Sequence, residues 1–225
     1  MAFVKYLGHS SFEIRMGGRI LYTDPWWDPR PLHGERLVPP GIQVEQIKKA
    51  DMILISNEAP DHCDNFEVKR LQEKTFAQVL APEPALAKLE VNPRQRMTAY
   101  QDDRFHVMGL DIHVTKAKQP KSQYPVGYII SAGGQSVYFA GATYEFYDMH
   151  HINVDCAILP IGGRQTMDIF GALNAIRMIK CKYVVPMRYN TFKLIEANAR
   201  EFELKAQKSG KASPVMLRVG EGFDF

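Results

Sequence analysis

The order of hydrophobic and polar positions along the chain predicts strand meanders together with alternating strands and helices. Short runs of β-forming residues bounded by turn residues predict strands at 3–8, 11–16, 19–24, 105–109, 110–117, 126–132 and 135–141. The other periodic segments predict strands at 51–56, 77–82, 154–160, 182–187 and 214–220, and helices at 44–50, within 57–74, and at 84–90, 166–180 and 198–208. Meanders followed by strand–helix units imply an α/β fold of two sheets with helices outside.

Polar residues gather where several of the predicted strands end. In open α/β layers a ligand lies beyond the carboxyl ends of the strands, so a functional site is expected there. Four clusters follow predicted strands, and a fifth is the turn between the first two strands: 56–62, 117–121, 141–145, 188–191 and 8–10.

The segment from Asp24 to Gly41 is predicted to form an irregular rim or lid beside the site. It holds five prolines, which oppose regular structure, and a loop this long in a compact domain is usually functional. Trp26 and Trp27 within it are expected to be exposed, either as contacts for a ligand at the pocket mouth or as part of an interface between copies of the chain.

The composition describes one folded body with little net charge. The chain has 225 residues, of which 45% are hydrophobic and 24% charged, and its formal charge is +3. These values exclude a disordered chain, a collagen-like repeat and a small disulfide scaffold. Because no Gly/Ser-rich or highly charged linker divides the sequence, a single domain over residues 1–225 is expected.

Cysteine usage and hydropathy predict a cytoplasmic location. Cys63, Cys156 and Cys181 are odd in number and lack Cys-x-x-Cys spacing, which favours reduced thiols. No stretch of the sequence approaches the ~18 apolar residues of a spanning helix, so no membrane partner is expected. Basic residues are scattered, so no nucleic-acid partner is expected, whereas a homo-oligomer remains open.

Several blocks, in order and at matching spacing, resemble the metallo-β-lactamase superfamily. They are LGHSSFEI, the Asp24-Pro25 pair, DMILISNEAPDHCD, PVGYII, FAGATYEFYDM, AILPIGGRQTM and VVPMRYNTF, which together span nearly the whole chain. More narrowly, they resemble metal-dependent hydrolases of the ascorbate-6-phosphate-lactonase type. The resemblance implies an αββα sandwich of two mixed β-sheets with helices on both outer faces and an active site at one edge, although a shared fold does not transfer the chemistry.

Five of the seven metal-ligand positions that the resemblance implies hold other residues here. In the family's first block, Thr-His-x-His-x-Asp-His, Asn57 and Ala59 stand in place of the two leading histidines. Lys118 corresponds to the histidine after the middle strands. Ala142 corresponds to the aspartate that bridges both metals, and Arg188 to the last histidine. An ammonium or guanidinium group cannot donate to a metal at neutral pH, and its charge opposes a dication.

Only Asp61 and His62 keep ligand chemistry at these positions. Zinc or manganese held for catalysis needs at least three histidine or carboxylate donors and an open position for water. The sequence therefore predicts a degenerate homologue, or pseudoenzyme, with no catalytic or metal-binding residue and no cofactor. The alternative is a hydrolase of the phosphoester or lactone class that holds one zinc or manganese ion through Asp61, His62 and either His9 or Glu58.

Two roles are open for the former active-site cleft of such a homologue. In the first, Arg188 and Lys118 close an internal ion-pair network with Asp61, Glu58 or Asp24, which leaves a stable but inert fold. In the second, their surplus charge binds a small anionic ligand, a phosphate or a carboxylate. The residues expected to line the ligand site are His9, Asp24, Asn57, Glu58, Asp61, His62, Lys118, Arg188 and Asn190.

Other residues have both a chemical and a structural interpretation. His62 is suited to act as a general base, or to bond to backbone at the start of a helix. Cys63 is a conceivable nucleophile near a helix N-terminus, although a structural role is favoured. Thr166, after the Gly162-Gly163 turn, is a candidate N-cap. Roles at the surface or in strand packing are predicted for His106, His113, His150 and His151.

Overall fold

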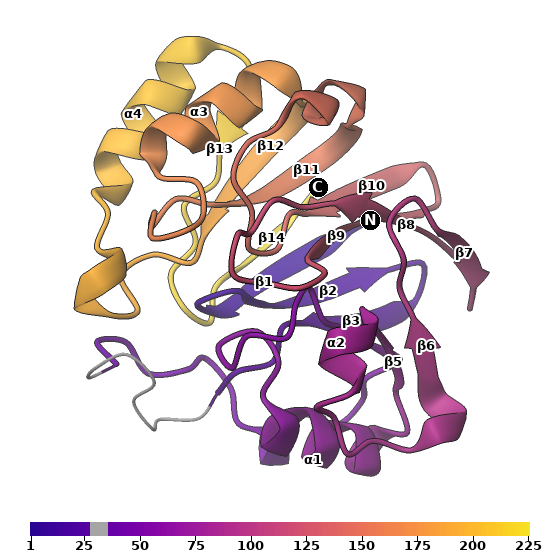
Figure 1. Ribbon diagram of the computed structural model, residues 1–225. Coiled ribbons are helices and arrows are strands. Elements are labelled where there is room, and N and C mark those ends of the chain that lie inside the picture. Colours follow the sequence, from indigo (N-terminus) through magenta and orange to yellow (C-terminus); the bar gives the residue numbers. More distant parts are fainter. Residues whose placement is uncertain (28–35) are drawn as a thin grey trace.

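The computed structural model describes residues 1–27 and 36–225, and it shows two β-sheets packed face to face between helices (Figure 1). Helices α1 (Asn65–Thr75) and α2 (Glu83–Leu86) cover one sheet, and α3 (Ile169–Met178) and α4 (Ala199–Ser209) cover the other. The αββα sandwich of two mixed sheets that the sequence predicts is therefore confirmed. Residues 28–35 of the predicted rim lie outside the described residues.

The first sheet is formed by β1 (Phe3–Gly8), β2 (Ser11–Met16), β3 (Arg19–Thr23), β4 (Met52–Leu54), β5 (Gln78–Ala81), β6 (Arg96–Thr98) and β14 (Gly222–Asp224). Among the described residues its strand order is β14-β1-β2-β3-β4-β5-β6. The strands from β14 to β3 are antiparallel to their neighbours, and those from β3 to β6 run parallel. The sheet is therefore mixed, and its parallel half leads into the loops that follow β3 and β4.

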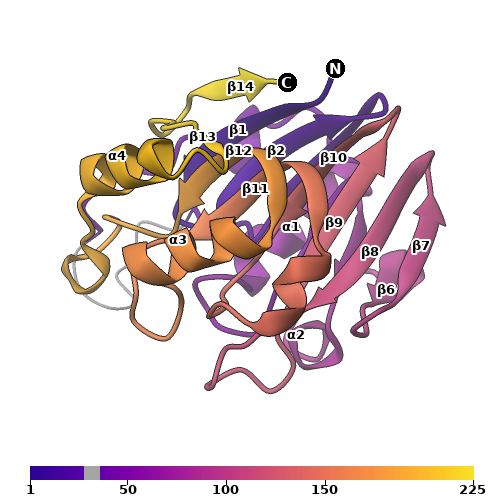
Figure 2. The same ribbon diagram turned by 90° about the horizontal axis from the view of Figure 1, so that it is seen from above.

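The second sheet is formed by β7 (Arg104–Val107), β8 (Leu110–Lys116), β9 (Val126–Ala132), β10 (Gln135–Phe139), β11 (Asn153–Pro160), β12 (Lys180–Met187) and β13 (Ser213–Pro214). Its order is β13-β12-β11-β10-β9-β8-β7, and Figure 2 shows β11 to β7 side by side. Strands β7 to β10 are antiparallel, and β10 to β13 are parallel. Short 3-10 helices η1 to η4 lie at Val44–Gln46, Pro93–Gln95, Tyr147–His151 and Lys193–Ile195.

The core between the sheets is built from large side chains that alternate along the strands. Phe12 of β2 and Phe139 of β10 are fully buried, and their ring centroids lie 6.5 Å apart. The Tyr128 hydroxyl of β9 crosses the interface and donates to the Ile55 carbonyl at 2.7 Å. Burial of one such side chain contributes about 1.5–3 kcal/mol, so the facing strands are held firmly. The loops at the sandwich edge are thereby placed on a rigid base.

The main differences from the predicted elements lie in polar or proline-containing segments. The predicted helix at 44–50 is only the 3-10 turn η1, and the predicted final strand at 214–220 is wrong. Pro214 has no N–H to extend a ladder, and the Arg218 N–H donates to Glu221 Oε2 in a turn. The chain then returns as β14 beside β1, so both termini lie together (Figure 2).

The described helices are short. The longest, α1 and α4, have 11 residues each, and no helix in residues 1–27 or 36–225 is long and apolar enough to cross a bilayer.

Candidate functional site

The loop that follows β4 turns sharply and directs Asp61 and His62 into the protein. Asn57 fixes this turn from within, because its Oδ1 accepts from the Ala59 N–H at 2.9 Å and its Nδ2 donates to the Ser56 hydroxyl at 3.0 Å. The Ala59 carbonyl in turn accepts from the His62 N–H at 2.9 Å. Asn57 was predicted to line the ligand site, but both polar atoms of its side chain form hydrogen bonds within the loop.

The turn between β1 and β2 brings His9 to the same place. Both Gly8 and His9 have left-handed backbone angles, with φ of 104° and 56°. Such an angle is strained for a histidine and is typical of functional sites. The His9 carbonyl accepts from the Arg188 N–H at 2.8 Å, which ties the turn to the end of β12. Its ring packs edge-on against Trp26 and Phe192, at centroid distances of 5.0 and 5.7 Å.

Three buried side chains converge where these loops meet. The His9 Nε2 atom lies 3.2 Å from Asp61 Oδ2, and the His62 Nε2 atom lies 3.9 Å from the same oxygen. One ligand atom from each residue lies within 4.8 Å of the others, and no other group of three such residues occurs in the described part of the chain. Donors that share a zinc ion at about 2.0–2.1 Å stand roughly 3–3.5 Å apart, so this cluster needs only small shifts to enclose a cation.

His62 is oriented by a buried carboxylate. Its Nδ1 lies 2.6 Å from Asp24 Oδ2, and Asp24 also accepts from the Ser56 N–H at 2.7 Å and the Ser56 hydroxyl at 2.6 Å. Burial raises the pKa of Asp24, and the hydrogen bonds from His62 and Ser56 act against that rise. The 2.6 Å contact lets His62 donate from Nδ1 to Asp24 Oδ2, the arrangement by which a carboxylate orients a histidine ligand. Its Nε2 then presents a lone pair, and this buried atom has no hydrogen-bond partner among the described residues.

His9 has the corresponding arrangement with a hydroxyl in place of the carboxylate. Its Nδ1 lies 3.1 Å from Thr191 Oγ1, which can donate or accept. The Thr191 hydroxyl also has the Tyr189 carbonyl as an acceptor at 3.4 Å. His9 can therefore donate from Nδ1 to Thr191 and turn the Nε2 lone pair toward Asp61.

The electrostatics favour a neutral His9 beside an ionised Asp61. Burial lowers the pKa of His9 to about 3, although the hydrogen bond and charge of Asp61 act in the other direction. Burial alone would raise the pKa of Asp61, but His62, His9 and Arg188 together hold it well below its ordinary value. A neutral imidazole and a carboxylate are the protonation states that a metal ion requires of its ligands.

Arg188, the residue after β12, also lies beside this carboxylate. Its Nη2 is 3.6 Å from Asp61 Oδ2, and its Nη1 donates to the Gly163 carbonyl at 3.1 Å. Only 8% of the residue is exposed. Of the three partners that the sequence suggests for Arg188, Asp61 alone forms the ion pair, because Asp24 is bonded to His62 and Ser56, and Glu58 is engaged in another loop.

Three other predicted site residues lie outside the cluster. Glu58 accepts from two donors in the segment 122–123, at 2.6 and 2.7 Å. Lys118 is exposed, and its ammonium lies 5.9 Å from the centroid of the Phe146 ring, so it brings no charge to Asp61. The Asn190 Oδ1 atom accepts from the backbone N–H of Ala197 at 2.8 Å, which shapes the segment before α4.

Two further interpretations, of the tryptophan pair and of Thr166, are corrected, and the structural role favoured for Cys63 agrees with its burial. Trp26 and Trp27 are buried rather than exposed, with 1% and 0% accessibility. Trp26 packs against the His9 ring, and Trp27 packs against Tyr22. Burial raises the pKa of the Cys63 thiol to about 12, so it is no nucleophile. The N-cap of α3 is Asp168, not Thr166.

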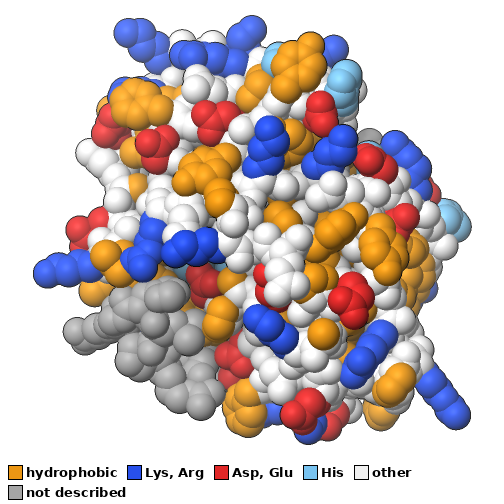
Figure 3. All heavy atoms as spheres, viewed as in Figure 1, with side chains coloured by type: hydrophobic (Ala, Val, Ile, Leu, Met, Phe, Trp, Pro, Cys, Tyr) orange, Lys and Arg blue, Asp and Glu red, His pale blue; other side chains and the backbone are white. Residues whose placement is uncertain are grey.

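Asp61 of the cluster and Arg188 line a cleft of about 390 Å³. Lys and Arg side chains are interspersed with Asp and Glu over the face seen in Figure 3, so surface charge alone does not single out a site there. Ser56 and Thr191 border the cluster and Arg164 lines the cleft, although the sequence singled out none of the three. Ser56 and Thr191 fall within the polar clusters that follow predicted strands, and this position is the sequence feature that could have identified them.

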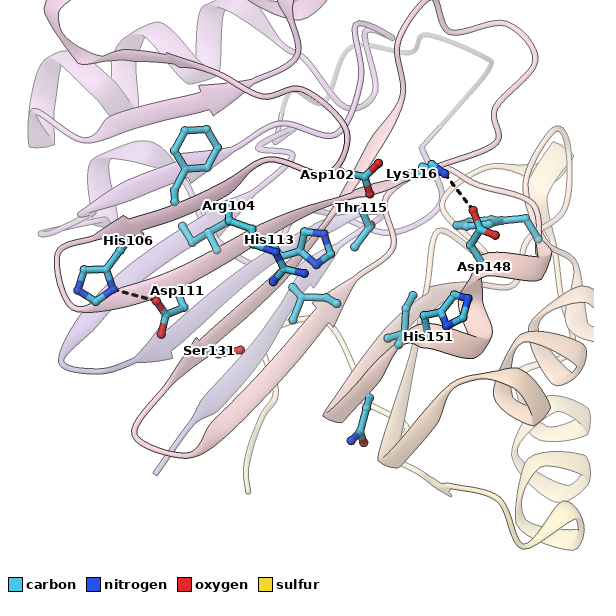
Figure 4. A pocket seen from close by; sticks show the side chains of 16 residues that line it. Asp102, Arg104, His106, Asp111, His113, Thr115, Lys116, Ser131, Asp148 and His151 are labelled. Atoms are coloured by element: carbon cyan, nitrogen blue, oxygen red, sulfur yellow. Dashed lines mark hydrogen bonds and ion pairs between the residues drawn. The ribbon is translucent and has the colours of Figure 1, made fainter.

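A larger hollow of about 800 Å³ lies beside β7, β8 and η3, away from the cluster (Figure 4). Several of its charged groups lie in pairs, since His106 lies 2.8 Å from Asp111 and Lys116 lies 3.1 Å from Asp148. Figure 4 shows the rings of His106, His113 and His151 well separated. Size alone therefore does not identify the functional site.

Comparisons with known proteins give the same fold and a consistent name. Residues 3–188 match the model of the beta-lactamase superfamily domain. Proteins named "UPF0173 metal-dependent hydrolase" from Thermococcus onnurineus and Korarchaeum cryptofilum are 32% and 30% identical, over 98% and 100% of both chains. The structure of Igni18, described as a metallo hydrolase from Ignicoccus hospitalis, has a TM-score of 0.81 and 30% identity, covering 100% of this chain and 99% of that one.

The prediction of a pseudoenzyme that needs no cofactor is wrong. Relatives of this chain along its whole length are named metal-dependent hydrolases, and the described residues bring together three side chains that could hold a metal ion. The prediction counted donors by their place in one motif and assigned His9 to the pocket lining. The findings agree better with the alternative of a hydrolase that holds one metal ion, and of the two third donors named for it, His9 lies beside Asp61, with its Nε2 3.2 Å from Oδ2.

Proposed function

The chain belongs to the beta-lactamase superfamily, and on this basis we propose that it is a metal-dependent hydrolase that holds one divalent metal ion through His9, Asp61 and His62. Two histidines and one carboxylate form a ligand set that is common in catalytic zinc sites. Zinc and manganese are the metals proposed, because both accept imidazole and carboxylate donors.

The observation that carries this proposal is the unpartnered Nε2 atom of His62. A buried polar atom without a hydrogen bond costs about 1–3 kcal/mol, so such an atom normally has a purpose. Here the Asp24 carboxylate fixes the ring so that this lone pair faces the Asp61 carboxylate. A lone pair and an anion directed at one point fit a cation between them.

The chemistry that a divalent ion supplies in such a site is Lewis-acid polarisation of a carbonyl or phosphoryl group and a lower pKa for water. The residues of the chain supply the rest. Asp24 and Thr191 hold the two imidazoles in register, and the buried rings of Trp26 and Phe192 exclude bulk water from His9. A dry site strengthens every charge interaction within it.

Arg188 has a separate role in the proposed reaction. Its guanidinium is held beside Asp61 by the Gly163 carbonyl, and the residue lines the cleft. Hydrolysis of an ester, lactone or phosphoester develops negative charge on an oxygen of the substrate, and a fixed guanidinium stabilises that charge without reorganisation. Arg188 is therefore expected to contribute to turnover rather than to metal binding.

The proposal is tested with protein that has been stripped with a chelator and reloaded with zinc or manganese. Hydrolysis of a panel of lactones and phosphomonoesters is expected only after reloading. A His62→Ala variant should lose this activity, whereas His151→Ala, at an exposed histidine outside the cleft, should keep it. Activity that survives chelation unchanged, or that His62→Ala leaves intact, would refute the proposal.

A further inference from the structure

The cleft beside the cluster carries more positive than negative side chains. Its charged lining consists of four cationic residues and two carboxylates: Lys88, Lys121, Arg164, Arg188, Glu58 and Asp61. Both carboxylates are already engaged, Glu58 by donors from the segment 122–123 and Asp61 by the histidines and Arg188. The cleft therefore has a surplus of positive charge, which a bound divalent cation would increase.

Two of the cations at the rim have no counter-charge. Among the described residues, no hydrogen bond or ion pair engages the side chain of Arg164 or Lys121, although both line the cleft. Lys88 differs, because its ammonium donates to the Glu58 carbonyl at 2.9 Å. Arg164 and Lys121 are thus free to meet a ligand.

Arg164 and Arg188 line the same cleft, and the neighbour of Arg164 in sequence, Gly163, contacts Arg188. The loop that carries Arg164 is strained, since Gly163, Arg164 and Gln165 all have left-handed angles, with φ of 65°, 49° and 72°. The Gly163 carbonyl of the same loop accepts a hydrogen bond from Arg188. The loop that carries Arg164 therefore also holds Arg188 in place.

We propose that Arg164 and Arg188, with Lys121 at the rim, bind an oxyanion group of the substrate, so that the substrate class is a phosphate- or carboxylate-bearing compound. The Arg164 guanidinium suits such a group because it can donate two parallel hydrogen bonds to its oxygens, and Arg188 adds a second positive charge in the same cleft. The cleft volume of about 390 Å³ lies in the range of small-molecule sites. This inference rests on the proposed hydrolase, because it names the charge of its substrate.

The test is calorimetric titration of phenylphosphonate into metal-free and metal-loaded protein, with benzyl alcohol as an uncharged ligand of similar size. Phenylphosphonate is expected to bind both forms, and the metal-loaded form more tightly, whereas benzyl alcohol should not bind. An Arg164→Gln variant should raise the dissociation constant about tenfold in both forms, the loss of one charge-assisted contact. Arg94→Gln, at an exposed arginine on η2, is the matched control and should leave binding unchanged.

The outcomes separate this inference from the proposed function. Metal content is measured on the same samples, and Arg164→Gln should bind as much metal as the unmodified protein. Equal effects of Arg164→Gln and Arg94→Gln, or no phenylphosphonate binding in either form, would overturn the anion site even if the metal binds. Binding that depends on Arg164 in a protein that takes up no metal would support the anion site and refute the hydrolase.

Discussion

At the scale of single residues, the two histidines of the cluster share one design. Each uses Nδ1 for a partner behind it, Asp24 for His62 and Thr191 for His9, and each points Nε2 at the same oxygen of Asp61. A hydrogen-bond partner on the other nitrogen of a histidine ligand fixes the tautomer and the orientation of the ring. Loss of that partner usually lowers metal affinity. Substitution of these partners therefore tests the site without removing any of the three proposed metal ligands.

An Asp24→Asn variant should lower metal affinity by about 10–100-fold. Asparagine tolerates the left-handed angle of residue 24, with φ of 37°, so the fold is kept. Its amide N–H₂ would face His62 Nδ1, however, and favour the tautomer whose Nε2 carries the proton. Asp51→Asn, which removes a partly buried carboxylate beside Arg19, is the control, and calorimetric titration of zinc into both variants is the measurement. Equal losses in both variants would contradict the role given to Asp24.

An Arg188→Gln variant should raise metal affinity, by about tenfold, and lower turnover. The guanidinium lies 3.6 Å from Asp61 Oδ2, so its charge both competes for this ligand and repels a cation. The same change removes the group proposed to stabilise charge on the substrate. Zinc titration and kcat are measured on one preparation, and a fall in metal affinity would show that Arg188 supports the site in another way.

The stability of the metal-free protein should fall on mild acidification because of His9. Its pKa is about 3 in the folded protein and near 6.5 in the unfolded chain, so the unfolded chain binds the extra proton between these values. Unfolding free energy should therefore decrease as pH falls from about 7 to about 4.5, by on the order of 2 kcal/mol from this residue. Urea unfolding should show a shallower dependence for His9→Gln, but not for His106→Gln at an exposed position. Parallel curves for the unmodified protein and His9→Gln would refute this assignment.

At the scale of elements, the site is made by loops that leave strands of both sheets. Ser56 to His62 follow β4, His9 lies between β1 and β2, and Arg188 follows β12. Gly141, after β10, allows these loops to approach. A Cβ atom there would lie 2.6 Å from the Ser56 Cβ and 2.9 Å from the Val126 carbonyl, and its φ is +63°. Ser56 donates hydrogen bonds to Asp24, and Asp24 orients His62. By leaving room for Ser56, Gly141 supports the proposed metal cluster indirectly.

A Gly141→Ala variant should lose both stability and metal affinity. Gly133→Ala is a close control, because its φ of +58° is similar but nothing lies within 4 Å of the added Cβ. The control should lose about 1 kcal/mol from backbone strain alone, and Gly141→Ala at least about 3 kcal/mol, since backbone must move. Denaturant unfolding and zinc titration are the measurements, and equal losses would mean that the close approach at Ser56 is unimportant.

The sequence predicts regular elements well and the site only in part. Strands 3–8, 11–16 and 126–132 have the expected bounds because strict patterns end at glycines or turns. The return of β14 to β1 depends on a turn at 218–221 that no periodicity reveals. Strand-end clusters point to the right edge of the sandwich, yet the third metal-binding residue, His9, depends on a left-handed turn and a contact across 52 positions of sequence. Contacts of that kind follow from packing rather than from local pattern.

At the scale of the whole molecule, one cation would join segments from both sheets. His9 and His62 belong to the first sheet's loops, and Thr191 and Arg188 tie His9 to the segment at the end of β12 in the second. A ligand that binds only the folded state stabilises that state by mass action. Metal binding should therefore be visible in global unfolding.

Zinc at a hundred times its dissociation constant should raise the unfolding free energy by about 2.7 kcal/mol. The gain should vanish in Asp61→Asn, which removes the shared ligand, and should persist in Asp155→Asn, at a carboxylate paired with Lys182 on the outer part of β11. Denaturant unfolding with and without zinc measures it. A gain that Asp61→Asn retains would place the metal elsewhere in the molecule.

Elemental analysis of the dialysed protein after loading with zinc or manganese tests the metal centre most directly. We expect about one equivalent per chain in the unmodified protein and almost none in His9→Gln, Asp61→Asn or His62→Ala, since a catalytic ion needs all three donors. A folded protein that retains no metal, or variants that retain as much as the parent, would contradict the account.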